Sequence, residues 1–270
     1  MIFIMFTKHL MGKSIGEIME ILRDVGVEGA DLCVRPGYPV NPENAHSALP
    51  AVARDFEREG LSIPLVTAPT DFTDPEISYA ERLYGACAES GIGLLKIGYW
   101  RMEEDGYWAT LDRVRRKLDG FSRLSERFGV KTCIHIHSGG NMGLNASSAM
   151  DMVCGFDPRY LGIFADTGHL SISGEPIGMA LEITKEYLSA IAFKDLVRER
   201  ILKDGRRSWQ VRVVPIGEGY VEWPEVLKAM RKVGFDGPVS FHSEYSGYPV
   251  VTVVDMTRID VRFIRSLMGT

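Results

Sequence analysis

A short pattern that recurs along the chain constrains its fold more than any other sequence feature. Each copy has a charged helix end, a glycine, an apolar residue and then an apolar run, as in DVGVEGADL from Asp24 and RFGVKTCIHI from Arg127. A glycine adopts the left-handed conformation that caps a helix, and the apolar residue after it packs back on the helix. Five glycines occupy this position: Gly26, Gly60, Gly91, Gly129 and Gly234. The pattern therefore predicts alternating helices and strands.

The spacing of these glycines indicates how many strand–helix units the chain contains. Neighbouring copies lie about 31–38 residues apart, and the last interval is about three times as long. A chain of 270 residues accordingly divides into eight units. Eight apolar runs are predicted as strands, at residues 2–7, 30–34, 62–67, 94–98, 131–137, 161–166, 188–194 and 239–242.

Eight such units predict an α/β fold, a (β/α)8 TIM barrel that forms a single domain over residues 1–270. The alternative is an open doubly wound sheet, and the lack of a GxGxxG after the first strand argues against it. One unit is irregular, because residues 198–214 contain the turn pair Asp204-Gly205. This pair predicts a hairpin inserted after the seventh strand.

Composition and charge narrow the class of protein and its partners. With 31 basic and 36 acidic residues the net charge is −5, which argues against nucleic acid or a membrane surface as a partner. The chain contains no apolar stretch of membrane-spanning length, and its first residues do not resemble a signal peptide. The cysteines form no CxxC motif and are predicted as buried thiols of a reducing compartment: Cys33, Cys87, Cys133 and Cys154. We therefore expect a cytoplasmic protein, for which a homo-oligomer is possible.

Ionisable side chains gather at the ends of the predicted strands. In a TIM barrel the active site lies at the C-terminal ends of the strands. Five of the six histidines fall there, namely His9, His135, His137, His169 and His242. Charged residues share these positions, namely Lys8, Arg35, Lys96, Asp166, Lys194, Asp195 and Glu244. We predict a functional site at this mouth of the barrel.

Some of these residues form a candidate metal site. His135 and His137 are two apart and can point to one side of their strand, and the same holds for His242 and Glu244. Two histidines and carboxylates that converge can hold a divalent metal such as Mn, Mg, Zn or Co. The candidate ligands are His135, Asp166, His242 and Glu244. The alternative is that these groups form hydrogen bonds at the barrel rim without a metal.

The cationic side chains predict an anionic or polyhydroxylated small molecule as substrate, because Arg and Lys bind carboxylate and phosphate groups. We assign Lys8, Arg35, Lys96 and His137 to substrate binding. The alternative is that each cation forms a salt bridge at the rim.

The motifs FTKHL, GADLCVRPG, IHIHSGG, LGIFADTGHL, AFKD, VPIGEGYVEW and GPVSFHSEY follow one another along the chain. In this order they resemble the sugar phosphate isomerase/epimerase family of xylose isomerase-like TIM barrels, over essentially the whole chain. The resemblance implies an isomerase or epimerase that acts on a small sugar, ketose or sugar acid. Its reaction would begin with removal of a proton next to a carbonyl group.

The resemblance also implies a metal site with Glu, Asp, His and Glu on strands five to eight. Asp166 matches this pattern, whereas His135, Ala192 and His242 stand at the other three positions. Glu244 can restore a carboxylate to the site. Alternatively the metal is lost, and Lys194 places an ammonium near the vacant position.

Proton transfer next to a carbonyl needs a base, an acid and a group that stabilises the oxyanion. Glu244 or His135 is the candidate base, and His169 matches the histidine of the family's DxxH, which suits acid–base work. Lys194 or a metal would stabilise the oxyanion. Three alternatives stay open: a dehydratase-type lyase, a Schiff-base aldolase acting through Lys194, and a metal-free binding barrel. The acidic net charge argues against a DNA-repair role.

Overall fold

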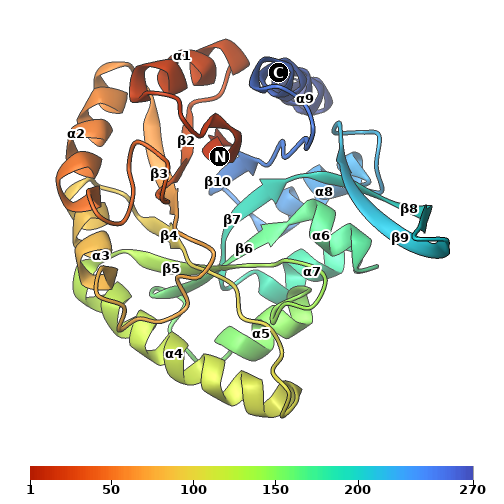
Figure 1. Cartoon of the computed structure of the whole chain (residues 1–270), viewed down its shortest axis with the longest axis horizontal. Coiled ribbons are helices and arrows are strands. Elements are labelled where there is room, and N and C mark those ends of the chain that lie inside the picture. The colour runs from red at the N-terminus through yellow and green to blue at the C-terminus, as the bar shows by residue number, and fades with distance from the viewer. Residues whose placement is uncertain (270) are drawn as a thin grey trace.

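The computed structural model describes residues 1–269, and its centre is a closed barrel of parallel strands (Figure 1). The barrel strands are β1 (Ile2–Phe6), β2 (Gly29–Cys33), β3 (Ser62–Thr67), β4 (Leu94–Lys96), β5 (Lys131–His135), β6 (Leu161–Asp166), β7 (Leu188–Phe193) and β10 (Pro238–Phe241). Neighbours in the barrel follow the order β1-β10-β7-β6-β5-β4-β3-β2, and β1 closes the ring by pairing with both β2 and β10. The prediction of a single-domain TIM barrel is confirmed, and the open sheet is excluded.

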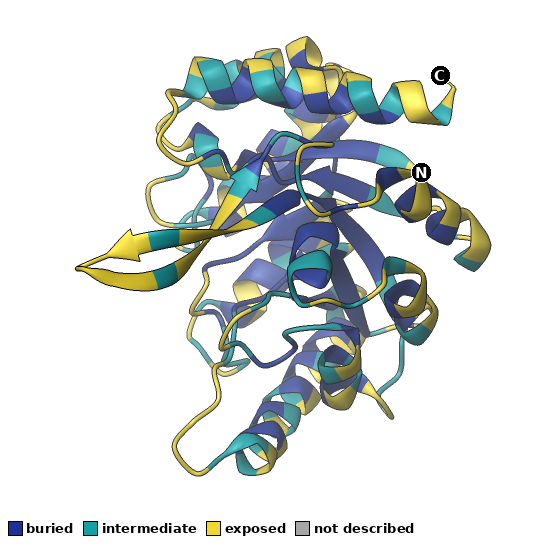
Figure 2. Ribbon diagram, turned by 90° about the vertical axis from the view of Figure 1, so that its right-hand side faces the viewer, coloured by how far each residue is buried: buried dark blue, intermediate teal, exposed yellow. Residues whose placement is uncertain are grey.

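Helices surround the barrel and bury one face each against it. They are η1 (Thr7–Leu10), α1 (Ile15–Val25), α2 (Ala45–Arg58), α3 (Ala80–Glu89), α4 (Tyr107–Phe128), α5 (Ala146–Val153), α6 (Thr167–Ile172), α7 (Ile177–Thr184), α8 (Trp223–Val233) and α9 (Val250–Met268). In α4, for example, Leu111, Val114, Leu118 and Phe121 lie on the buried face at helical spacing. Figure 2 shows the buried strands at the centre and the exposed faces of the helices outside.

The five predicted junction glycines all have positive φ. Gly26, Gly129 and Gly234 cap the C-termini of α1, α4 and α8 in the left-handed conformation. Gly60 and Gly91 lie one residue beyond the C-caps of α2 and α3. The glycine pattern therefore marks real ends of helices, and this is why it revealed the repeat.

We expect Gly129→Ala to lower the free energy of unfolding by about 1–2 kcal/mol, because alanine must adopt a left-handed conformation there. A Cβ at this position meets no atom within 4 Å, so the loss comes from the backbone alone. Gly16→Ala is the matched control, since Gly16 lies in α1, also faces open space and has no positive φ. The control is expected to leave stability unchanged or to raise it by about 0.5–1 kcal/mol. Urea unfolding of both variants measures the difference, and equal losses would contradict the prediction.

The irregular unit is an antiparallel hairpin of β8 (Asp195–Lys203) and β9 (Arg206–Val214), which extends away from the barrel (Figures 1 and 2). Its turn residues Asp204 and Gly205 have φ of 51° and 72°, as a two-residue hairpin turn requires. The hairpin begins at Asp195 and so is longer than the range 198–214 expected from the sequence.

The base of the hairpin is held by one buried carboxylate. Asp195 accepts hydrogen bonds from the backbone N–H groups of Leu196, Gly217 and Val221, at 3.0–3.1 Å, and from the indole of Trp223 at 2.9 Å. A Cβ at Gly219 would lie 2.0 Å from Asp195 Oδ1, so only glycine fits beside this carboxylate. The first residue of β8 thus binds the segment that follows β9.

Two predictions about composition can be compared with the structure. Cys33, Cys87 and Cys133 are buried free thiols as expected, whereas Cys154 is exposed at the end of α5, so the prediction of a buried thiol was wrong there. Within residues 1–269, no helix combines the length and the hydropathy that crossing a membrane requires.

Candidate functional site

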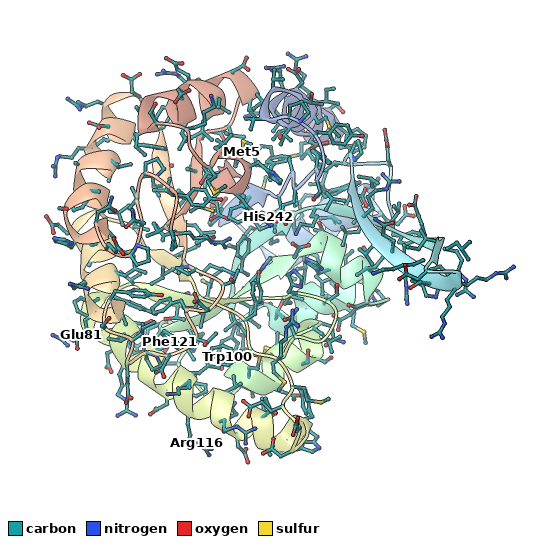
Figure 3. All side chains as sticks on the ribbon, viewed as in Figure 1. Met5, Glu81, Trp100, Arg116, Phe121 and His242 are labelled. Atoms are coloured by element: carbon teal, nitrogen blue, oxygen red, sulfur yellow. The ribbon has the colours of Figure 1, made fainter. Side chains whose placement is uncertain are left out.

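A cavity of about 130 Å³ opens at the C-terminal ends of the barrel strands. Its lining includes eight residues that the sequence predicted for the site: Lys8, Arg35, Lys96, His135, His137, Lys194, His242 and Glu244. The ring of His169 lies 3.8 Å from that of His137, and Asp166 is fully buried at the end of β6. The structure therefore brings these ten residues together, whereas the Asp195 carboxylate binds the base of the hairpin instead. Figure 3 shows His242 near the centre of the barrel.

Three buried atoms that lie close together at this mouth of the barrel have no hydrogen-bond partner. They are His135 Nε2, Asp166 Oδ2 and His242 Nδ1. Asp166 Oδ2 lies 3.3 Å from His135 Nε2 and 3.8 Å from His242 Nδ1, and one ligand atom from each of the three residues falls within 4.8 Å of the others. Burial lowers the pKa of His135 well below its usual value, so its imidazole is neutral. Imidazole nitrogens and a carboxylate oxygen suit a divalent ion, so these three residues fit one.

The ammonium group of Lys194 lies next to the carboxylate of Asp166. Its Nζ lies 3.3 Å from Asp166 Oδ2 and 2.5 Å from Glu244 Oε2. Burial alone would lower the pKa of Lys194, but Asp166 and Glu244 raise it above its usual value. Burial alone would likewise raise the pKa of Asp166, and Lys194 holds that pKa well below its usual range. Lys194 is therefore a fixed ammonium without a free lone pair, which argues against the Schiff-base aldolase acting through this residue.

Glu244 lies outside the cluster of three unpartnered atoms. Its carboxylate forms ion pairs with Lys194 on one side and with Lys8 of η1 on the other. Burial alone would raise the pKa of Glu244, but Lys194 keeps it well below its usual range. Glu244 is thus ionised and bound by two lysines.

His169 connects Lys194 to the opposite side of the cavity. Its Nε2 is 3.4 Å from Lys194 Nζ, and its Nδ1 is 2.9 Å from Ser138 Oγ. Its backbone N–H donates to Asp166 Oδ1 at 3.0 Å, so the carboxylate caps the short helix that carries the histidine. Burial lowers the pKa of His169 to about 3, which keeps the ring neutral.

The remaining predicted cations differ in their surroundings. Arg35 donates from Nε to the carbonyl oxygen of Ala68 at 3.0 Å and lies over the ring of Phe6. Lys96, the last residue of β4, is only 2% exposed and its Nζ has no hydrogen-bond partner. Burial lowers the pKa of Lys96 well below its usual value, and the charge of Arg35 lowers it further. Burial therefore disfavours the ammonium that the sequence predicted for Lys96, although its Nζ lies over the ring of Tyr99, 3.8 Å from the centroid.

Two residues that orient the histidines were not predicted. The Tyr99 hydroxyl is 2.7 Å from His135 Nδ1, and Asp31 Oδ2 is 3.3 Å from His242 Nε2. Each contact holds the ring nitrogen that faces away from the cluster, as outer partners of metal-binding or catalytic histidines do. The signal for Asp31 was its position inside the buried strand β2, where a carboxylate needs partners.

Comparison with known proteins shows the family to which the chain belongs. The pattern of the xylose isomerase-like TIM barrel family matches residues 19–267. The structure is similar to D-psicose 3-epimerase from Clostridium cellulolyticum H10, solved with D-tagatose, with a TM-score of 0.75, 13% identity and 99% of each chain covered. It is also similar to the IOLI protein with a bound zinc atom, with a TM-score of 0.75, 15% identity, and 99% of this chain and 98% of that chain covered.

Among curated proteins, an inosose dehydratase of Bacillus licheniformis is 28% identical over 142 residues, which are 48% of this chain and 46% of that protein. The chain spans about half the length of the curated relatives it matches. The structural similarities, all at low identity, concern the fold, whereas the family match covers most of the sequence. The chain belongs to the family of xylose isomerase-like TIM barrels.

Proposed function

We propose that the chain is an isomerase or epimerase that moves a proton next to the carbonyl group of a small sugar, ketose or sugar acid. The observation that carries the proposal is the convergence of Lys194, Asp166 and the neutral His135 in one small cavity at the C-terminal mouth of the barrel. Such a site combines positive charge for an oxyanion with groups that accept a proton. The similarity to a sugar epimerase supports the substrate class.

The positive charge has two sources in this proposal. Lys194 stabilises the oxyanion that forms when the substrate loses its proton. A divalent ion such as Mn²⁺, Mg²⁺, Zn²⁺ or Co²⁺, if held by His135, Asp166 and His242, would polarise the carbonyl oxygen as a Lewis acid. The three unpartnered atoms of these residues support this metal site.

The proton-transfer roles follow from charge state. Glu244 is ionised and can accept a proton from carbon. The neutral His135 can do so only when its Nε2 holds no metal ion, because Tyr99 occupies its Nδ1. His169 lies between Lys194 and Ser138 and is placed to pass a proton along this side of the cavity. Lys8, Arg35 and His137 line the cavity and would bind the substrate's oxygen atoms.

The proposal also concerns partners and location. The cavity at the barrel mouth supports a small molecule as the partner, and we propose a small carbohydrate; the net charge of −5 favours such a partner over nucleic acid. The free cysteines support a reducing compartment, and we propose the cytoplasm. A homo-oligomer is compatible with this function.

Deuterium exchange tests the proposal. The protein is incubated in deuterated water with a panel of ketoses and sugar acids, with and without each divalent metal, and the substrates are analysed by mass spectrometry. We expect deuterium next to the carbonyl group of at least one compound, together with its isomer or epimer. A panel without exchange under every metal condition would exclude the proposed reaction.

A dehydratase-type lyase is the second candidate, supported by the similarity to the inosose dehydratase. It shares the first proton abstraction but then expels a hydroxyl group from the neighbouring carbon. The same mixtures distinguish the two, because dehydration produces a new enone absorbance and a product lighter by one water. If the mixtures contain an enone but no isomerised sugar, the chain is a lyase and not an isomerase.

A further inference from the structure

Lys96 differs from the other two lysines assigned to the site, Lys8 and Lys194, which both form ion pairs with carboxylates. It ends β4, lines the cavity and is 2% exposed, yet its Nζ has no hydrogen-bond partner. The neighbour that the structure gives to this nitrogen is the ring face of Tyr99, whose centroid lies 3.8 Å away. A long polar side chain is thus buried with its reactive end toward a cavity and without a carboxylate in ion-pair contact. The carboxylates of Asp31 and Glu244 attract it only from a greater distance.

The contrast with Lys194 shows what this environment does to an amine. Lys194 is equally buried, but two carboxylates bind its Nζ and keep it charged. Around Lys96, burial disfavours the ammonium, and the nearby charge of Arg35 repels it. A buried lysine without a paired carboxylate loses its proton more readily than an exposed one, and the free amine is a nucleophile.

We propose that Lys96 captures the carbonyl group of a small aldehyde or ketone as a Schiff base inside the cavity. The inference rests on the proposed function in one respect, which is that the ligand is a carbonyl compound. It adds a covalent site on β4, on the side of the cavity away from the ion pairs of Lys194 with Asp166 and Glu244.

The reaction is an ordinary condensation. The lone pair of Nζ forms a bond to the carbonyl carbon, and the electron pair of the C=O bond moves to the oxygen. A proton passes from nitrogen to that oxygen and gives a neutral carbinolamine. After the oxygen takes a second proton from solvent, the C–O bond breaks, water leaves and the nitrogen lone pair completes a protonated C=N bond. This imine withdraws electrons from the neighbouring C–H and so assists removal of its proton.

Borohydride trapping tests the inference with dihydroxyacetone as the probe. The wild-type protein is mixed with the ketone at pH 7, reduced with borohydride and digested, and each modified lysine is located by mass spectrometry. We expect the occupancy of Lys96 to exceed that of any other lysine about tenfold or more. An ordinary lysine with a pKa of about 10.4 is a free amine in fewer than roughly one molecule in a thousand at this pH.

Two variants complete the test. Lys96→Met removes the amine but keeps an apolar chain of similar length, and it is expected to abolish the main adduct. Lys228→Met is the matched control, because Lys228 is exposed and bound to Glu225 on α8, and it should trap as much as the wild type. Adducts on Lys194, equal adducts on surface lysines, or no adduct at all would each overturn the inference. The location of the adduct in the wild type decides the question even if Lys96→Met fails to fold.

The two proposals can fail separately. A reduced adduct on Lys96 in a protein that exchanges no deuterium would support the covalent site and exclude the isomerase. Deuterium exchange without any adduct on Lys96 would support the isomerase and exclude the covalent site.

Discussion

Replacing Lys194 with methionine is expected to lower the free energy of unfolding by about 3–5 kcal/mol at neutral pH. The side chain of Lys194 is 3% exposed, and its ammonium is shared by Asp166 and Glu244. Methionine keeps most of the buried volume but leaves two carboxylates without their common cation. Urea unfolding monitored by circular dichroism measures the loss.

An exposed ion pair supplies the control. Lys185 directly follows α7 and pairs with Glu182 on that helix, and the two side chains are 50% and 46% exposed. Lys185→Met is therefore expected to leave the stability close to that of the wild type. If Lys194→Met loses no more than this control, the assignment of Lys194 as the fixed cation of the site is wrong.

The same variant reveals how Lys194 and a metal compete. Without the ammonium, the cluster of His135, Asp166 and His242 has lost a neighbour that repels cations. Adding Mn²⁺ or Zn²⁺ should therefore raise the melting temperature of Lys194→Met more than that of the wild type. At a hundredfold excess over its dissociation constant, a bound ion adds about 2.7 kcal/mol. A variant that melts at the same temperature with and without either metal would contradict the proposed metal site.

Asp166→Asn is expected to reduce the proposed deuterium exchange by about 10²–10⁴-fold. Its Oδ2 lies near His135, Lys194 and His242, so either source of positive charge depends on this one carboxylate. Asparagine has the same shape as aspartate. Its side-chain oxygen can still accept the hydrogen bond from the backbone N–H of His169 and so cap the N-terminus of α6. The initial rate of deuterium incorporation into the responsive ketose measures the effect.

Asp112→Asn is the control for this variant, because Asp112 is exposed on α4 and lies on no part of the cavity lining. It is expected to exchange at the wild-type rate. Retention of that rate by Asp166→Asn would show that the carboxylate takes no part in the reaction.

The barrel could be predicted because its signals are local. A glycine cap needs only the residues around it, and eight repeats with parallel strands leave little freedom in topology. The convergence of His135, Asp166 and His242 followed from the same argument, since each stands at or next to the C-terminal end of a barrel strand.

The charge states of the site could not be predicted in this way. Lys96 and Lys194 both follow apolar runs at strand ends and are alike in sequence, yet one is unpartnered and the other binds two carboxylates. The contact of Asp31 with His242 joins residues 211 positions apart and depends on the closure of the barrel through β1. Such differences arise from neighbours that only the folded chain brings near.

The hydrogen bonds of Asp195 at the base of the β8–β9 hairpin keep changes in the length of the hairpin from altering the geometry of the cavity. Lys194 precedes Asp195 directly, so any segment inserted after β7 could displace the ammonium by pulling on its backbone. Because the Asp195 carboxylate at the start of the hairpin binds the segment that follows it, the hairpin can lengthen, shorten or change its surface chemistry while Lys194 keeps its place. The fold can thus acquire new recognition surfaces beside its reactive centre without rebuilding that centre.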